Sequence, residues 1–260
     1  MLKPRGNGYN SPVLAIRRLL QDVIDLCYPG LCAGCKAECR DGDAFCPGCL
    51  EGLRALEEVA ACVRCGGPLA TPEAPCPFCQ GRGLSYYKSV HRLATFTEPL
   101  KGLIHQAKYS HRWGLAELLA ERLCVTTGVR ELLCDADVLV PVPLHFLRQF
   151  RRGYNQAEVI ARHISRHSGT HVARAISRVR HTQSQTHLTR RGRFQNVRQA
   201  FKLLDARPIA GRHVVVIDDV MTTGATLKAV ARVLRRARPA SISALLLAVA
   251  DPRGRDFRAV

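Results

Sequence analysis

The stretch VVVIDDVMTTGAT, residues 214–226, decides the fold class of this chain. Residues 214–217 form a short β-branched run, which is typical of a buried strand in a parallel sheet. Two adjacent carboxylates, Asp218 and Asp219, follow the run, and a threonine-rich loop leads into a helix predicted for 226–238. The order of strand, acidic pair, polar loop and helix is that of one unit of an α/β domain.

The loop after the acidic pair has the features of a phosphate-binding site. Backbone N–H groups at the start of a helix, together with the helix dipole, attract an anion. Gly224 lets the backbone approach a phosphate closely, and threonine hydroxyls add donors. The glycine patterns of a Walker loop and of a dinucleotide fingerprint are both absent. The residues expected to hold the phosphate are Thr222, Thr223, Gly224, Ala225 and Thr226.

Asp218 and Asp219 would repel a ligand that consisted of phosphate alone. They become useful when the same ligand carries two neighbouring hydroxyls, because hydroxyls donate charge-assisted hydrogen bonds to carboxylates. The ligand that fits both parts of the motif is a sugar 5′-phosphate with a free diol.

Four Cys-x-x-Cys pairs lie near the N-terminus, and each cysteine of the last two pairs follows its counterpart in the first two by 30 positions. This spacing indicates a duplication. Disulfides and thioredoxin-like redox pairs are the alternatives. Disulfides need an oxidising compartment and we see no signal-peptide pattern, and a redox dithiol is usually single, not repeated four times in register. We therefore expect two structural zinc ions, each with four thiolates, and ligand pairing within or between repeats stays open. The predicted ligands are Cys32, Cys35, Cys46, Cys49, Cys62, Cys65, Cys76 and Cys79.

The chain divides by composition after Gln80-Gly-Arg-Gly83, which reads as a linker. Residues 1–83 are expected to hold an N-terminal helix at 13–24 and a double zinc ribbon, and residues 84–260 an α/β domain. Strands and helices alternate in the second part, which predicts a parallel sheet flanked by helices with its ligand at the carboxyl ends of the strands. A hairpin is predicted for 85–96, helices for 98–123, 154–166 and 226–238, and strands for 137–142, 214–217 and 242–249.

Positive charge is concentrated in the second part of the chain. The formal charge is +18, residues 1–83 are neutral, and residues 148–212 carry 15 basic side chains against two acidic ones. Such a block favours a polyanion, although a solvated basic face is the simpler alternative. Residues 174–202 suit a flap over a phosphorylated ligand, a groove for nucleic acid, or both. The arginines expected to contact nucleic acid are Arg178, Arg180, Arg190, Arg191, Arg193 and Arg198.

The apolar runs of this sequence are short. The longest, Ala244–Ala250, has seven residues, whereas about 20 are needed to span a bilayer. We therefore expect a soluble, cytoplasmic protein.

Residues 214–224 resemble the phosphoribosyl-pyrophosphate (PRPP) motif of type I phosphoribosyltransferases: a hydrophobic run, two acids, two variable residues and Thr-Thr-Gly. Within that superfamily the chain is similar to the ComF family of competence proteins over nearly its whole length. The likeness includes the double zinc element and several further motifs. These are YPGLC at 28–32, LKGLIHQAKY at 100–109, VPVPLH at 140–145 and RRGYNQAE at 151–158, whereas the ending Ala-Val-Ala-Asp at 248–251 departs from the family pattern.

The resemblance implies a type I phosphoribosyltransferase-like fold and assigns roles to individual residues. Asp218 and Asp219 would hold the ribose diol, and Pro143 and Leu144 would meet the pyrophosphate, with Mg²⁺ as an intermediary. If catalysis occurs, cations would stabilise the departing pyrophosphate. The candidates are Arg151, Arg152 and Lys108.

Two functions compete at this stage. A ComF-like protein would bind PRPP and handle single-stranded DNA during uptake, near a DNA-translocating helicase at the inner face of the membrane. A metabolic phosphoribosyltransferase would instead transfer the ribose 5-phosphate of PRPP to a base or an amine. The two share a fold and differ in the acceptor, and fold alone does not decide between them.

Overall fold

A computed structural model of the chain describes residues 31–39, 43–109, 113–126, 128–179, 200–251 and 253. The helix predicted for 13–24 lies outside these ranges, as do the side chains of Tyr109, Arg148 and Arg151. The chain forms two units, Met1–Glu51 and Gly52–Val260, and helix α2 (Pro47–Glu57) crosses the division.

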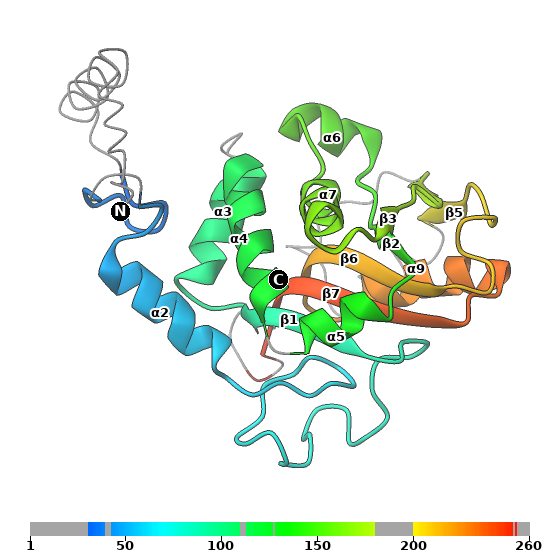
Figure 1. Cartoon of the computed structure of the whole chain (residues 1–260), viewed down its shortest axis with the longest axis horizontal. Coiled ribbons are helices and arrows are strands. Elements are labelled where there is room, and N and C mark those ends of the chain that lie inside the picture. The colour runs from blue at the N-terminus through cyan, green and yellow to red at the C-terminus, as the bar shows by residue number, and fades with distance from the viewer. Residues whose placement is uncertain are drawn as a thin grey trace, which may run out of the picture. The chain divides into compact units, whose positions relative to one another are not determined.

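Five parallel strands form the main sheet of the larger unit, in the order β1-β7-β6-β2-β3 (Figure 1). The two central strands are long and consist largely of buried valine, isoleucine and leucine, as expected of a parallel sheet covered on both faces. The strands are β1 (Val90–Thr95), β2 (Val138–Pro141), β3 (His171–Val172), β6 (His213–Met221) and β7 (Ser241–Val249).

Helices cover both faces of this sheet. Helices α4 (Trp113–Val125) and α7 (Gln156–Ser168) pack against each other and over one face. Helix α9 (Ala225–Leu234) covers the other, sharing a buried cluster with Val214 and Val216 of β6. The remaining elements are α3 (Leu100–Tyr109), α5 (Val129–Cys134), α6 (Phe146–Arg152), the 3-10 turn Arg235–Ala237, and an antiparallel pair of β4 (Ile176–Arg178) with β5 (Phe201–Leu203).

The predicted α/β architecture is confirmed, and its central strands and helices fall within a few residues of the expected ranges. The hairpin predicted for 85–96 is wrong, because β1 is a single strand that pairs in parallel with β7. The residues before β1 already pair with that strand: Lys88 N donates to Ile242 O (2.7 Å) and Ala244 N to Ser89 O (2.9 Å). The single helix predicted for 98–123 is two helices, α3 and α4.

The second cysteine element is joined to the sheet of the larger unit. Leu84 N donates to Arg64 O (2.9 Å), and Val90 N, at the start of β1, donates to Val63 O (2.8 Å). The division between the two units therefore falls between the two cysteine sets, earlier in the chain than the linker predicted at 80–83. That residues 1–83 form a domain by themselves stays a prediction.

Within the described ranges, no helix combines the length and the apolar character needed to cross a lipid bilayer.

Candidate functional site

Asp218 and Asp219 lie near the carboxyl end of β6, where that strand separates from β2. The last hydrogen bond between the two strands runs from Val142 N to Ile217 O (2.9 Å), whereas β6 stays paired with β7 as far as Met221. The chain continues from β2 to β3 on one side and from β6 to β7 on the other. The acidic pair therefore sits at a topological switch point, the place where open parallel sheets bind their ligands.

Thr222, Thr223 and Gly224 turn the chain from β6 into α9. Gly224 has a φ of 71°, and a Cβ at this position would lie 2.9 Å from Leu84 Cδ1. Ala225 N, at the start of the helix, donates to Thr223 Oγ1 (3.4 Å). The left-handed φ favours glycine, and a Cβ would have to displace the end of the Leu84 side chain, so the loop presents its backbone at the start of a ten-residue helix.

The acidic pair carries unusual electrostatics. Burial, and then the neighbouring charge of Asp219, raises the pKa of Asp218 to about 7. Asp219 N donates to Asp218 Oδ1 (2.9 Å), and Lys108 Nζ lies 3.0 Å from Asp219 Oδ2. Lys108 lowers the pKa of Asp218 as well, but burial dominates. The site therefore pairs one acidic side chain with a lysine and places beside it a second carboxyl whose neutral form is favoured by burial.

The loop after β2 faces the point where β6 leaves that strand. Pro143 and Leu144 are half-buried there, and the side chain of His145 is buried. Asn155 Nδ2 donates to Val142 O (3.0 Å), which fixes the start of the loop. These contacts hold in place the backbone that is implied to meet the pyrophosphate.

The segment at 151–158 also positions Lys108. Tyr154 donates its hydroxyl proton to Ala107 O, and Gln156 Nε2 donates to the same oxygen (3.4 Å). Arg152 Nη1 donates to Gln156 Oε1 (3.3 Å). The side chain of Arg151 is not among those described. The segment thus ties the end of α3, which carries the lysine, to the start of α7.

Of the six arginines predicted to contact nucleic acid, the structure describes Arg178. Its guanidinium lies over the ring of Phe201, 5.4 Å from the centroid, and its charge lowers the pKa of Asp218. Arg178 is therefore close enough to act on the acidic pair, a role that composition did not suggest. The other five lie outside the described residues: Arg180, Arg190, Arg191, Arg193 and Arg198.

Tyr87 is a site residue that sequence reasoning missed. Its side chain is buried, and its hydroxyl donates to Leu227 O of α9 (2.8 Å). Burial, and then the charge of Asp218, raises the pKa of Tyr87. The tyrosine braces the helix behind the phosphate loop. No local pattern marks it, because its partner lies 140 positions away.

The eight predicted zinc ligands form two groups, one within each repeat. In each group the four sulfur atoms lie within 4.8 Å of one another, and Cys35 Sγ and Cys46 Sγ are 3.6 Å apart. Zn–S bonds of about 2.3 Å in a tetrahedron place sulfurs about 3.8 Å apart, so both groups fit a zinc ion. None of the described cysteines forms a disulfide. The question of pairing is thereby answered: each repeat could hold its own ion.

In the first group, backbone N–H groups favour the ionised form of one of the predicted zinc ligands. Burial would raise the pKa of Cys32, but the N–H groups of Cys46 (3.2 Å) and Gly34 (3.3 Å) point at its sulfur and lower the pKa to about 6. A Cβ on Gly34 would lie 2.8 Å from Cys49 Sγ, so glycine is required there. The backbone therefore stabilises a thiolate, which is the form that binds zinc.

A buried arginine accompanies the second group. The side chain of Arg92 in β1 is 4% exposed, its Nε and Nη1 atoms have no hydrogen-bond partner, and Nη2 donates to Val59 O (3.4 Å). Burial lowers the pKa of Arg92 to about 10, and the negative charge of Cys65 opposes this shift. Four thiolates around one Zn²⁺ carry a net charge of −2, which would compensate the buried guanidinium.

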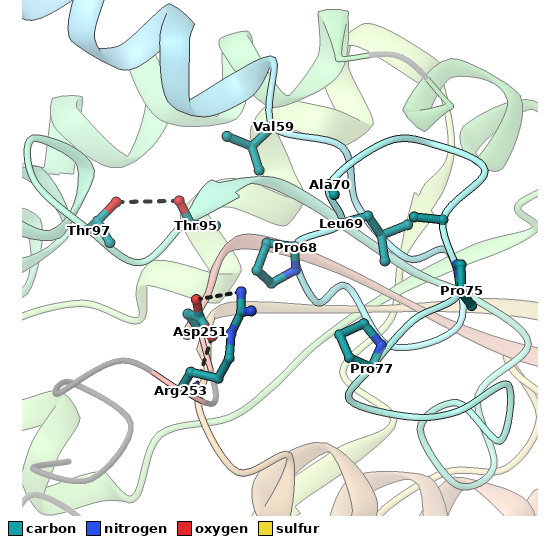
Figure 2. A pocket seen from close by; sticks show the side chains of 11 residues that line it. Val59, Pro68, Leu69, Ala70, Pro75, Pro77, Thr95, Thr97, Asp251 and Arg253 are labelled. Carbon is teal, nitrogen blue, oxygen red and sulfur yellow. Dashed lines mark hydrogen bonds and ion pairs between the residues drawn. The ribbon is translucent and has the colours of Figure 1, made fainter.

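A separate apolar pocket of about 480 Å³ lies at the carboxyl end of β1 (Figure 2). Pro68, Pro75 and Pro77 form much of its wall, and Asp251 and Arg253 pair with each other at its edge. One of its lining residues, Asp251, follows the carboxyl end of β7, at the edge of the sheet where Thr222 follows β6. Its rigid apolar wall suits a flat organic group.

The chain is similar to several known proteins. The family of the phosphoribosyl transferase domain matches residues 115–258. DNA utilization protein YhgH of Salmonella typhimurium is 33% identical over 226 residues, which cover 84% of this chain and 96% of that protein. Competence protein F of Haemophilus influenzae is 30% identical over 214 residues, 80% of this chain and 85% of that protein. Glutamine PRPP amidotransferase from B. subtilis, solved with ADP and GMP, overlaps 53% of this chain and 26% of its own, with a TM-score of 0.33 and 18% identity.

The matched domain and the loop after β6 define a phosphoribosyltransferase-type protein. Within that class, the chain belongs to the ComF family of competence proteins, because the relatives match along most of their own length and most of this chain.

Replacement of Gly224 by alanine is expected to damage the phosphate loop, because the new Cβ meets Leu84 and the backbone needs a positive φ. Gly211→Ala is the matched control, since Gly211 has a φ of 67° with no atom near its Cβ position. The control should cost about 1–2 kcal/mol of stability in thermal unfolding, the cost of a left-handed φ alone. Gly224→Ala should cost more and should weaken binding of ribose 5-phosphate at least tenfold in calorimetry, and equal behaviour of the two variants would contradict this reading.

The raised pKa of Asp218 predicts that this residue destabilises the folded chain. Above pH 7 the carboxyl is charged in both the folded and the unfolded state, and the folded state bears the full cost of burying it. Asp218→Asn should therefore raise the melting temperature by at least about 2 °C at pH 8. The gain should shrink as pH falls from about 7 toward 4, because the Asp218 carboxyl of the wild-type protein becomes protonated first in the folded state and then in the unfolded state. A gain that is absent at pH 8, or that grows toward pH 4, would show that Asp218 is not the strained group.

Arg92→Met is expected to weaken zinc binding at the second cysteine group, because it removes the charge that balances the thiolates. Purified protein should contain two zinc ions per chain by metal analysis, and a colorimetric chelator should remove one of them at least about tenfold faster from the variant. Cys32 and its partners serve as an internal control whose release rate stays unchanged. Arg92→Lys should restore slow release, and equal rates in all three proteins would refute the charge balance.

Proposed function

We propose that this protein binds PRPP through the loop between β6 and α9 and acts in the handling of single-stranded DNA. The observation that carries the first half is the paired aspartates followed by a glycine-capped loop at the topological switch point. Asp218 and Asp219 accept hydrogen bonds from the ribose hydroxyls, and residues 222–226 receive the 5′-phosphate. This matches a ligand that has a diol at one end and a phosphate at the other.

The pyrophosphate of PRPP lies on the other side of the switch point in this proposal. The backbone of Pro143 and Leu144 and the cations Arg151 and Arg152 form that side. Mg²⁺ accompanies the ligand and neutralises its phosphates, and it takes most of its ligands from phosphate oxygens and water. Lys108 stabilises Asp219 in the absence of ligand, and it can turn to the phosphates when the diol occupies the carboxylates.

The second half of the proposal rests on charge and on relatives. A formal charge of +18, concentrated after residue 83, suits a polyanionic partner. The similar proteins carry the names DNA utilization protein and competence protein F. In this proposal two zinc ions hold the cysteine elements. The protein works in the cytoplasm, at or near the inner face of the membrane, beside a DNA-translocating helicase.

Enzymatic transfer of ribose 5-phosphate from PRPP to a base or an amine is the second candidate. The matched phosphoribosyl transferase domain favours it. The proline-lined pocket of Figure 2, whose lining is separate from the acidic pair and the phosphate loop, is the place proposed for the acceptor. The reaction would release pyrophosphate through an oxocarbenium-like transition state, with cations on the leaving group. Pyrophosphate release with bases, amines and oligonucleotides as acceptors would identify this activity.

Asp218→Asn combined with Asp219→Asn is expected to abolish PRPP binding in calorimetry with Mg²⁺, because amides accept hydrogen bonds from the diol more weakly than carboxylates. Circular dichroism should confirm that the variant keeps its fold. Asp205→Asn, which removes an exposed carboxylate paired with Arg207, is the matched control and should bind PRPP as the wild type does. Unchanged affinity in the double variant would refute the site.

A further inference from the structure

Outside the phosphoribosyl site, a wide groove crosses the outer surface of α7. It has a volume of about 1010 Å³ and lies between the beginning of α4 and the edge strand β3. Its wall includes Trp113, Tyr154 and His171 as aromatic rings, and Arg162 and Arg166 as cations. We propose that this groove binds single-stranded DNA, with Trp113 as a stacking platform for a base. The inference rests on the proposed role in DNA handling and gives that role a location.

The side-chain chemistry of the groove is that of a single-strand binding surface. Proteins of that kind combine aromatic rings, on which bases stack, with a cationic path for the phosphates. Trp113 is 59% exposed, which is unusual for an indole that has no function at the surface. Arg162 and Arg166 are four positions apart on α7, so their guanidinium groups lie on the same face, about one helical turn from each other.

The two arginines are oriented but remain available. Arg162 pairs with Glu158 (2.7 Å) and Arg166 with Glu117, and both arginine side chains are about two-thirds exposed. Their carboxylate partners are less exposed, Glu158 at 15% and Glu117 at 29%. Glu158 also pairs with Arg174, so it keeps a cationic partner when Arg162 turns to a phosphate. The acidic partners thus hold the guanidinium groups in place until an anion of higher charge arrives.

The shape of the surface favours a polymer over a mononucleotide. The groove shares His171 and Val172 with a second depression of about 650 Å³, which is lined by Arg174 and Arg207. The two hollows together form one path along the β3 edge of the sheet. A chain of several nucleotides can follow this path, whereas one nucleotide would use only part of it.

The groove also connects to the phosphoribosyl site. Tyr154 lines the groove and donates its hydroxyl proton to Ala107 O. The next residue, Lys108, pairs with Asp219 of the acidic pair. The groove and the acidic pair are therefore linked through the end of α3, so the two proposed ligands bind connected parts of one unit.

Trp113 gives a direct test, because it is the single tryptophan of the chain. Titration of the full-length protein with oligothymidylate should quench its fluorescence in step with binding measured by the anisotropy of a labelled oligonucleotide. Trp113→Ala should weaken binding about 5- to 100-fold, whereas Trp113→Phe should keep most of the affinity, since a smaller ring still stacks. Arg162→Ala with Arg166→Ala should weaken binding and lower the slope of log affinity against log salt by about 1.4.

The matched control is Arg232→Ala with Arg236→Ala, which removes the same charge from an exposed position of α9 and one of the 3-10 turn after it, on the other face of the sheet. This control should lose much less affinity than the pair on α7. DNA binding that leaves Trp113 fluorescence unchanged and tolerates the groove variants would overturn the groove but keep the proposed function. Absence of any DNA binding in a protein that binds PRPP would overturn the groove and the DNA-handling half of the proposed function. Equal quenching by a poly-glutamate peptide would assign the groove to an acidic protein instead.

Discussion

The separation of β6 from β2 at Asp218 is the constraint on which the rest of this structure depends. The two strands are paired up to Ile217. The chain then continues from β2 toward β3 and from β6 toward β7, in opposite directions along the sheet, so a gap forms between their carboxyl ends. Two carboxylates are left at the opening, close enough that burial and mutual repulsion raise the pKa of Asp218 to about 7. Two carboxyl groups held together in this way destabilise the folded chain. Such arrangements are typical of functional sites, where a ligand uses them.

The surroundings of the pair reduce that cost without removing it. Lys108 compensates one carboxylate from the end of α3, and Tyr154 and Gln156 hold that end in place. Tyr87 holds α9 in place through a hydrogen bond to Leu227 O, and Gly224 lets the loop pack against Leu84. Side chains from separate parts of the chain are thus assembled around one motif of two acids and a threonine-rich turn. The second cysteine element also supports the sheet, because the backbone N–H of Val90 in β1 donates a hydrogen bond to Val63 O.

Much of this could be predicted from local patterns. The run at 214–226 gave the strand, the acids, the loop and the helix in their observed order, and the 30-residue repeat gave both cysteine groups. Long-range contacts could not be predicted. Tyr87 bonds a helix 140 positions away, and Arg178, expected on a nucleic-acid surface, acts on Asp218. The prediction of a hairpin at 85–96 was wrong for the same reason. The strand that pairs with β1 is β7, which comes about 150 residues later in the chain.

The central claim is that the paired aspartates hold the ribose of an activated sugar phosphate. A crystal structure of the protein with PRPP and Mg²⁺ tests it most directly. We expect both ribose hydroxyls within hydrogen-bonding distance of Asp218 and Asp219, and the 5′-phosphate on the backbone of residues 222–226. Electron density for PRPP elsewhere, or an empty loop at saturating ligand, would contradict it.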